Sequence, residues 1–138
     1  MASSERPIVG VAVVVEKDGN VLVGRDLRKG HVFGVPGGHW ENHETLKECA
    51  LREVFEESGI ECSHPKLISV YDFYREDKQK RYVTIGMKAT YVAGELRDLA
   101  TEGRFAWAWK PVREALALKL FPPDVILLER YLSGVVFE

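Results

Sequence analysis

The sequence predicts an α/β fold in which helices cover both faces of a mixed β-sheet, giving an α/β/α layered sandwich. Several short runs are rich in β-branched and aromatic residues, which is typical of strands. Separate segments between and after these runs carry the start and stop signals of helices. Because the chain has 138 residues and no low-complexity linker, we expect one domain spanning residues 1–138.

The first two strands form a predicted hairpin. Ile8 to Val15 is an aliphatic run, residues 17–20 supply turn-forming Asp, Gly and Asn, and Val21 to Val23 continues as the second strand. A polar connection then leads to a short strand at residues 33–35. We expect this strand to stop at residues 36–38, because their Pro-Gly-Gly sequence interrupts regular structure.

The first helix is predicted to run from about Glu44 to Ser58. Its N-cap is expected at Asn42 or His43, since both precede the helical pattern with a polar side chain. Gly59 is the expected C-terminal stop, because glycine adopts the left-handed conformation that ends many helices.

The second half of the chain is predicted to contain three strands and two helices. A charged segment joins the first two of these strands as a hairpin tip, and proline near its first turn starts the last helix. The strands are expected at residues 67–74, 82–92 and 105–109, the hairpin tip at 75–80, and the helices at 111–118 and 123–132.

Composition excludes several classes of protein. Its 46% hydrophobic and 29% charged residues are ordinary for a soluble globular protein, and no apolar run approaches the ~20 residues of a membrane span. Residues 1–6 are polar and are expected to form a flexible tail rather than a signal peptide. Two cysteines, Cys49 and Cys62, do not make a disulfide framework, so a reducing cytoplasm is the predicted location.

The charge is unevenly distributed along the chain. Residues 38–61 contain seven Glu against one Lys and one Arg, a balance of −5, while the remainder carries 17 basic and 14 acidic residues, a balance of +3. A negative pocket in a mildly positive body suits a metal ion and a phosphorylated small molecule. It does not suit polymeric nucleic acid, for which clustered Lys and Arg are expected.

Three glutamates of the first predicted helix lie on one side of it. At about 100° per residue, Glu53, Glu56 and Glu57 share an arc with Cys49 and Ala50, which should face the core. A pair of like charges at ~4 Å costs roughly 4 kcal/mol at an effective dielectric of about 20. Either the pKa values of these side chains rise, or a hard cation such as Mg²⁺ neutralises them.

The same segment fills a longer pattern without a gap. Residues 38–60 match G-x5-E-x7-R-E-U-x-E-E-x-G-U, where U is an aliphatic residue. The match fixes seven charged or glycine positions and two aliphatic ones, so a merely solvated acidic helix face is the weaker interpretation. This segment resembles the signature of the Nudix hydrolases, and the layout of the chain is similar to the MutT-type branch of that family.

The resemblance implies a metal site that holds Mg²⁺ or Mn²⁺. It makes the Gly37 carbonyl and the side chains of Glu53, Glu56 and Glu57 metal ligands, with Glu53 as first choice for the general base. Arg52 and Glu44 resemble the pair that orients these carboxylates, although an ordinary surface ion pair is the alternative. Glu102 resembles a downstream acid that serves relatives as an extra ligand or base, and its alternative is a solvated loop residue.

Substrate contacts are predicted on the same basis. Gly38 and His39 follow the turn at residues 36–38, and Arg25 resembles a phosphate-side arginine of the same branch. One aromatic side chain is expected to stack on a base, although such side chains more often belong to a core. The candidates are Phe33, Tyr74 and Trp107.

The predicted activity is metal-dependent cleavage of a (d)NTP, or an oxidised one such as 8-oxo-dGTP, to the monophosphate and pyrophosphate. Hydrolysis of ADP-ribose, NADH, a dinucleoside polyphosphate or dihydroneopterin triphosphate stays open, as does a non-catalytic nucleotide sensor. The apolar segments 125–128 and 135–137 could form a homodimer interface, although core packing explains them equally well.

Overall fold

A mixed, seven-stranded β-sheet organises the described part of the chain, with its main strands in the order β3-β2-β1-β6-β5. The computed structural model describes residues 6–29, 32–97 and 104–137. Of the predicted tail, residues 1–6, only Arg6 lies within these ranges. The strands are β1 (Ile8–Lys17), β2 (Asn20–Asp26), β3 (Phe33–Gly34), β4 (Gly37–His39), β5 (Glu61–Arg75), β6 (Lys80–Ala93) and β7 (Phe105–Pro111), and the helices are α1 (Leu46–Ser58), α3 (Val112–Leu116) and α4 (Pro122–Ser133).

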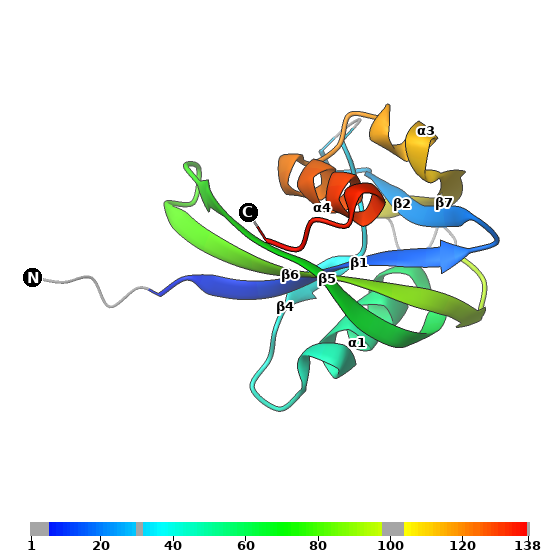
Figure 1. Ribbon diagram of the computed structural model, residues 1–138, viewed down its shortest axis with the longest axis horizontal. Coiled ribbons are helices and arrows are strands. Elements are labelled where there is room, and N and C mark those ends of the chain that lie inside the picture. The colour runs from blue at the N-terminus through cyan, green and yellow to red at the C-terminus, as the bar shows by residue number, and fades with distance from the viewer. Residues whose placement is uncertain (1–5, 30–31, 98–103, 138) are drawn as a thin grey trace, which may run out of the picture.

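The predicted α/β/α layering is confirmed. Figure 1 shows α1 on one side of the sheet and α3 with α4 on the other. Strand β1 runs parallel to β6 and antiparallel to β2 and β4, so the sheet is mixed as expected. No helix among the described residues is long and apolar enough to cross a bilayer.

The hairpin between β1 and β2 is also confirmed. Its two turn residues, Asp18 and Gly19, have φ values of 50° and 80°, and Lys17 pairs with Asn20. Positive φ at both central positions is what a tight two-residue hairpin requires, and an Asp-Gly sequence adopts it at little cost. This turn fixes the register of β1, which lies at the centre of the sheet.

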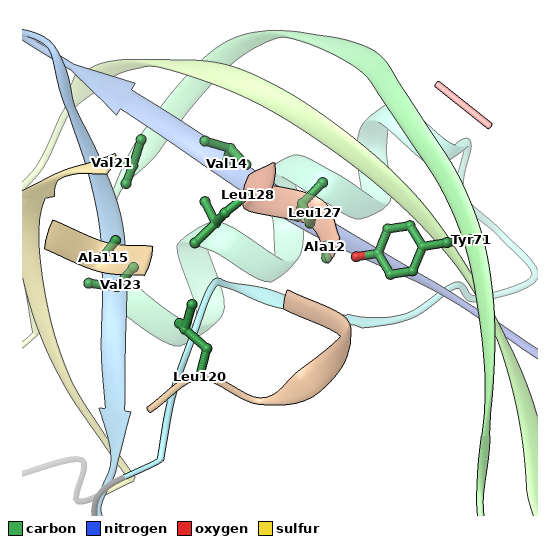
Figure 2. Packing of buried hydrophobic residues seen from close by; sticks show 9 residues of the cluster. All are labelled: Ala12, Val14, Val21, Val23, Tyr71, Ala115, Leu120, Leu127 and Leu128. Atoms are coloured by element: carbon green, nitrogen blue, oxygen red, sulfur yellow. The ribbon is translucent and has the colours of Figure 1, made fainter. Parts of the chain in front are cut away.

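Alternation along β1 divides the apolar residues into two cores. Ala12 and Val14 face α3 and α4, where Leu127 and Leu128 cover them (Figure 2). The intervening Val13 and Val15 face α1, where they pack with Ala50, Val54 and Trp107. A strand buried on both faces needs an almost continuous aliphatic run, which explains the sequence of residues 8–15.

Three predicted boundaries are wrong. Helix α1 begins after Thr45, not after Asn42 or His43, because Thr45 and Glu48 form a reciprocal capping box. Residues 37–39 do not merely end a strand, since they pair with β1 as β4. Strand β5 begins at Glu61 and contains Pro65, which is tolerated because β5 is an edge strand with register shifts there.

Candidate functional site

A cleft of about 350 Å³ opens between the sheet and the start of α4. This volume falls within the range of small-molecule sites. Strands β1 and β6 form its floor, β3 and α4 one wall, and the end of β5 another. The residues that line it include Lys29, Phe33, Gly34, Val35, Gly37, Gly38, His39, Glu57, Phe73, Arg75, Lys78, Tyr82, Arg104, Phe121 and Asp124.

Two glycines bring the backbone of β4 close to both β1 and α1. A side chain at Gly37 would collide with the carbonyl of Val11, and one at Gly38 would collide with the carboxylate of Glu53. Glycine at position 37 is therefore required by space rather than by backbone angle, whereas a side chain at position 38 would have to displace the Glu53 carboxylate. The close approach places the peptide groups of β4 beside the acidic side of α1.

Glu57 lies at the end of the cleft formed by Gly37. Its Oε1 accepts a hydrogen bond of 2.8 Å from the Gly37 amide. Burial raises the pKa of Glu57 to about 8, and the negative charge of Glu53 adds to the rise, while the Gly37 hydrogen bond opposes it. A carboxylate held this way is stabilised in its ionised form by any cation that binds next to it.

Arg52 organises the other acids of the predicted site. Its Nε and Nη2 donate to the two carboxylate oxygens of Glu44 at 2.8 and 2.7 Å, a bidentate geometry. Its Nη1 donates to Glu53 at 2.8 Å and to Glu56 at 2.9 Å. Hydrogen bonding to Arg52 lowers the pKa of Glu44 to about 2, so this carboxylate stays ionised.

The three predicted metal-binding glutamates do not all face inward, and this expectation requires correction. The side chain of Glu53 is 14% exposed, whereas that of Glu56 is 56% exposed and pairs with Arg52 one helical turn earlier. Burial raises the pKa of Glu53, although Arg52 works against the rise. Of these three glutamates, Glu53 and Glu57 are therefore the two whose charged forms are destabilised by partial burial.

The donor set nevertheless fits a hard divalent cation. Within residues 6–29, 32–97 and 104–137, no three His, Cys, Asp or Glu side chains converge as a ready-made metal cluster. Glu53 and Glu57 lie against Gly38 and Gly37, which line the cleft, and Mg²⁺ takes few carboxylates and completes its shell with other oxygens. These residues supply the kind of ligands that Mg²⁺ or Mn²⁺ requires.

The structure brings only some of the predicted substrate contacts to the cleft. Phe33, Gly38 and His39 line it, whereas Arg25, Tyr74 and Trp107 do not. Arg25 lies within the sheet, where it pairs with Phe33 and with β7. Tyr74 is 45% exposed beside the guanidinium of Arg81.

Trp107 has a structural role instead of a role in the cleft. Its ring packs in the core beneath α1 and against Gly24, and its indole Nε1 donates to the backbone carbonyl of Glu57 at 2.9 Å. This contact ties the C-terminal end of α1 to β7. The predicted residue Glu102 lies outside the described residues.

An aromatic wall replaces the single ring that the sequence predicted. Phe73 and Tyr82 are cross-strand neighbours whose rings stack at 5.2 Å between centroids, and Phe121 meets Phe73 edge-on at 6.0 Å. Neither Phe73 nor Phe121 was predicted. The alternation of β5 could have identified Phe73, because it lies on the opposite face from Tyr74.

Asp124 is a second residue that sequence reasoning missed. It is 7% exposed in the first turn of α4, and its Oδ2 accepts a hydrogen bond of 3.1 Å from the Val35 amide. Burial raises the pKa of Asp124 to about 7. In the sequence it was indistinguishable from the acids that commonly stabilise a helix N-terminus, so its place in the cleft could not be predicted.

Comparison with known proteins agrees with this geometry. The chain matches the family described as NUDIX domain over residues 5–131. An ADP-ribose pyrophosphatase of Methanocaldococcus jannaschii is 32% identical over 105 residues, which are 72% of this chain and 61% of that protein. Phosphatase NudJ of Escherichia coli (strain K12) is 38% identical over 74 residues, which are 53% of this chain and 48% of that protein.

The fold is shared over a greater length. The crystal structure of the MutT NUDIX hydrolase from Burkholderia pseudomallei has a TM-score of 0.77 and 27% identity, covering 91% of this chain and 98% of that chain. The two sequence relatives are longer, since the chain spans only half to about three fifths of their length. Because the family match takes in nearly the whole sequence, the chain belongs to the NUDIX domain family, and its resemblance to MutT-type members is confirmed.

Proposed function

We propose that this protein is a metal-dependent nucleotide pyrophosphohydrolase that converts a (d)NTP, or an oxidised one such as 8-oxo-dGTP, to the monophosphate and pyrophosphate. The observation that carries the proposal is the pairing of two environments in one cleft. Glu57 and the glycines of β4 form one end, and stacked aromatic rings line the rest. A diphosphate suits the first environment, and a nucleobase suits the second.

Glu53 and Glu57 would hold the metal together with the Gly37 carbonyl, while Glu56 remains a candidate for an outer position. A bound Mg²⁺ or Mn²⁺ supplies charge neutralisation on the phosphates and a lower pKa for bound water. Glu102 stays a proposed extra ligand or base. Arg52 fixes Glu53, and Glu44 fixes Arg52, so the acid nearest Gly38 is kept in one orientation.

The chemical step is hydrolysis of the anhydride between the α- and β-phosphates. The water oxygen forms a new bond to phosphorus, the bond from that phosphorus to the bridging oxygen breaks, and the products are the monophosphate and pyrophosphate. Glu53 is the proposed acceptor of the water proton, because Arg52 holds its carboxylate in place beside Gly38. The walls of the cleft orient the substrate and restrict the access of bulk water.

Asp124 is the proposed contact for the edge of the base. Its Oδ2 is held by Val35, and among the described residues Oδ1 has no protein hydrogen-bond partner. Phe33 and Phe121 line the same cleft, so a ring stacked there would present its edge to the carboxyl group. With its pKa raised to about 7, the group can accept a hydrogen bond or donate one near neutral pH.

A second candidate function is hydrolysis of another nucleoside diphosphate derivative. It is favoured by the relative named ADP-ribose pyrophosphatase, which is 32% identical. NADH, dinucleoside polyphosphates and dihydroneopterin triphosphate belong to the same alternative. Binding without turnover would indicate a nucleotide sensor instead.

We also propose a cytoplasmic location, because both cysteines are free. We propose no binding partner among polymeric nucleic acids.

Homodimerisation is proposed through the exposed apolar residues near the C-terminus. Size-exclusion chromatography with light scattering at several concentrations tests this, and a monomer at all of them would contradict it. The exposed residues are Leu132, Val135, Val136 and Phe137.

A nucleotide panel tests the activity and its metal requirement together. We expect pyrophosphate release from at least one (d)NTP in Mg²⁺, loss of all release in excess chelator, and recovery when Mg²⁺ is restored. Turnover that persists in chelator would contradict the metal requirement. Cleavage of ADP-ribose with no triphosphate turned over would select the second candidate function.

Glu57→Gln should lower kcat by about 10²-fold or more, as expected when a charge that stabilises the transition state is removed. The amide oxygen of glutamine can still accept the hydrogen bond from Gly37, so the fold should be retained. Glu129→Gln is the matched control, because Glu129 is exposed on α4. Equal rates for Glu57→Gln and the control would show that the site is misassigned.

Asp124→Asn should change the order of preference among bases rather than the chemistry. The asparagine oxygen can still bind the Val35 amide, but the group that faces the cleft becomes a fixed amide. We expect the ratio of kcat/KM between the best substrate and one with a different base edge to change by about 10-fold. A uniform decrease for every base would refute the assignment.

The same substitution should alter the dependence of stability on pH. The raised pKa of Asp124 means that folding favours its protonated form, so its contribution is fully present below about pH 4 and is lost as pH rises to about 7. Asp124→Asn should therefore gain free energy of unfolding relative to the unsubstituted protein between pH 4 and 7, on the order of a few kcal/mol. Urea unfolding of both proteins across this range measures the difference in the free energy of unfolding. A difference that does not change with pH would show that burial does not raise the pKa of Asp124.

A further inference from the structure

Two basic side chains, Lys29 and Arg104, line the cleft from the ends of neighbouring strands. Lys29 follows β2, and Arg104 immediately precedes β7. The two strand ends are joined because Asp26 pairs with Phe105 and the Leu27 amide donates to the Arg104 carbonyl at 2.7 Å. The backbone thus keeps both basic residues at one rim of the cleft.

Asp26 holds the backbone of this rim in place but does not form a hydrogen bond with the Arg104 guanidinium. It is 6% exposed, and its Oδ1 accepts hydrogen bonds from the backbone amides of Arg28 at 2.9 Å and Lys29 at 3.3 Å. Its Oδ2 lies 3.9 Å from the Arg104 guanidinium, which is too far for a hydrogen bond. Within the described ranges, no protein acceptor hydrogen-bonds to that guanidinium, whose side chain is 51% exposed.

This rim belongs to the cleft that contains the proposed catalytic residues. Lys29 and Arg104 line it together with Gly37 and Glu57. Arg75, beside the hairpin tip, also lines the cleft, but its guanidinium already donates two hydrogen bonds, of 2.8 and 3.1 Å, to the Asp77 carboxylate.

We propose that Lys29 and Arg104 form a subsite for the terminal phosphates of a triphosphate, so that the cleft selects triphosphates over sugar-capped diphosphates. A terminal phosphate carries about −1.5 to −2 charge at pH 7, and a diphosphate capped by a sugar lacks this group. Guanidinium donors match phosphate oxygens in geometry, and lysine adds a mobile point charge. The inference rests on the proposed hydrolysis, in which the β- and γ-phosphates leave together as pyrophosphate.

Direct binding of inorganic pyrophosphate tests the subsite apart from turnover. Isothermal titration of the full chain in Mg²⁺ should show about 10-fold weaker binding for Arg104→Gln and for Lys29→Gln, as expected when a hydrogen bond to a charged group is lost. Arg104→Lys should recover part of the affinity. Arg113→Gln, an exposed residue of α3 outside the cleft, is the matched control and should bind like the unsubstituted protein.

Kinetics with two substrates of the same base test the selection. Arg104→Gln should raise KM for a triphosphate about 10-fold and change kcat/KM for the matching sugar-capped diphosphate by less than about 2-fold. Unchanged pyrophosphate affinity, or equal losses on both substrates, would overturn the subsite. Absence of any turnover by the unsubstituted protein would instead refute the proposed function, and the binding measurement would still decide the subsite.

Discussion

The close approach of two acidic side chains to a glycine strand is the constraint on which the rest of the site depends. The Gly37 amide binds Glu57, and Glu53 occupies the space that a side chain at Gly38 would need. Partial burial makes the ionised form of either acid costly. Arg52 offsets that cost for Glu53 by direct pairing. Among the described residues, the ionised form of Glu57 is favoured by the Gly37 amide and by the more distant charge of Arg104. An additional cation beside Glu57 would offset the remaining cost of its ionised form.

The position of β4 links this constraint to the cleft. Because β4 pairs with β1, its glycines lie between helix α1 on one face of the sheet and the open cleft on the other. Acids from α1 therefore reach a ligand that contacts residues of the opposite layer. The stacked Phe73 and Tyr82 lie further along the same sheet. A surface suited to a metal ion and phosphates is therefore followed, in the same cleft, by a surface suited to an aromatic base.

Local patterns predicted the fold well and correctly brought Glu53 and Glu57 close to Gly37 and Gly38, but they predicted the lining of the rest of the cleft poorly. The run at residues 8–15 could be assigned because a strand buried on both faces has a distinctive composition. Glu56 was misplaced because a helical wheel does not show that Arg52 draws it toward solvent. Trp107 and Asp124 were missed or misassigned because their roles depend on contacts between segments distant in the sequence, namely Glu57 for the tryptophan and Val35 for the aspartate.

The division of the molecule into layers has a consequence for how such a protein can diversify. Helix α4, which begins beside the cleft, packs through Leu127 and Leu128 on a different hydrophobic core from helix α1, which packs through Ala50 and Val54. Mutations at the start of α4 can remodel ligand choice while the hydrolytic apparatus and its supporting interior are left intact.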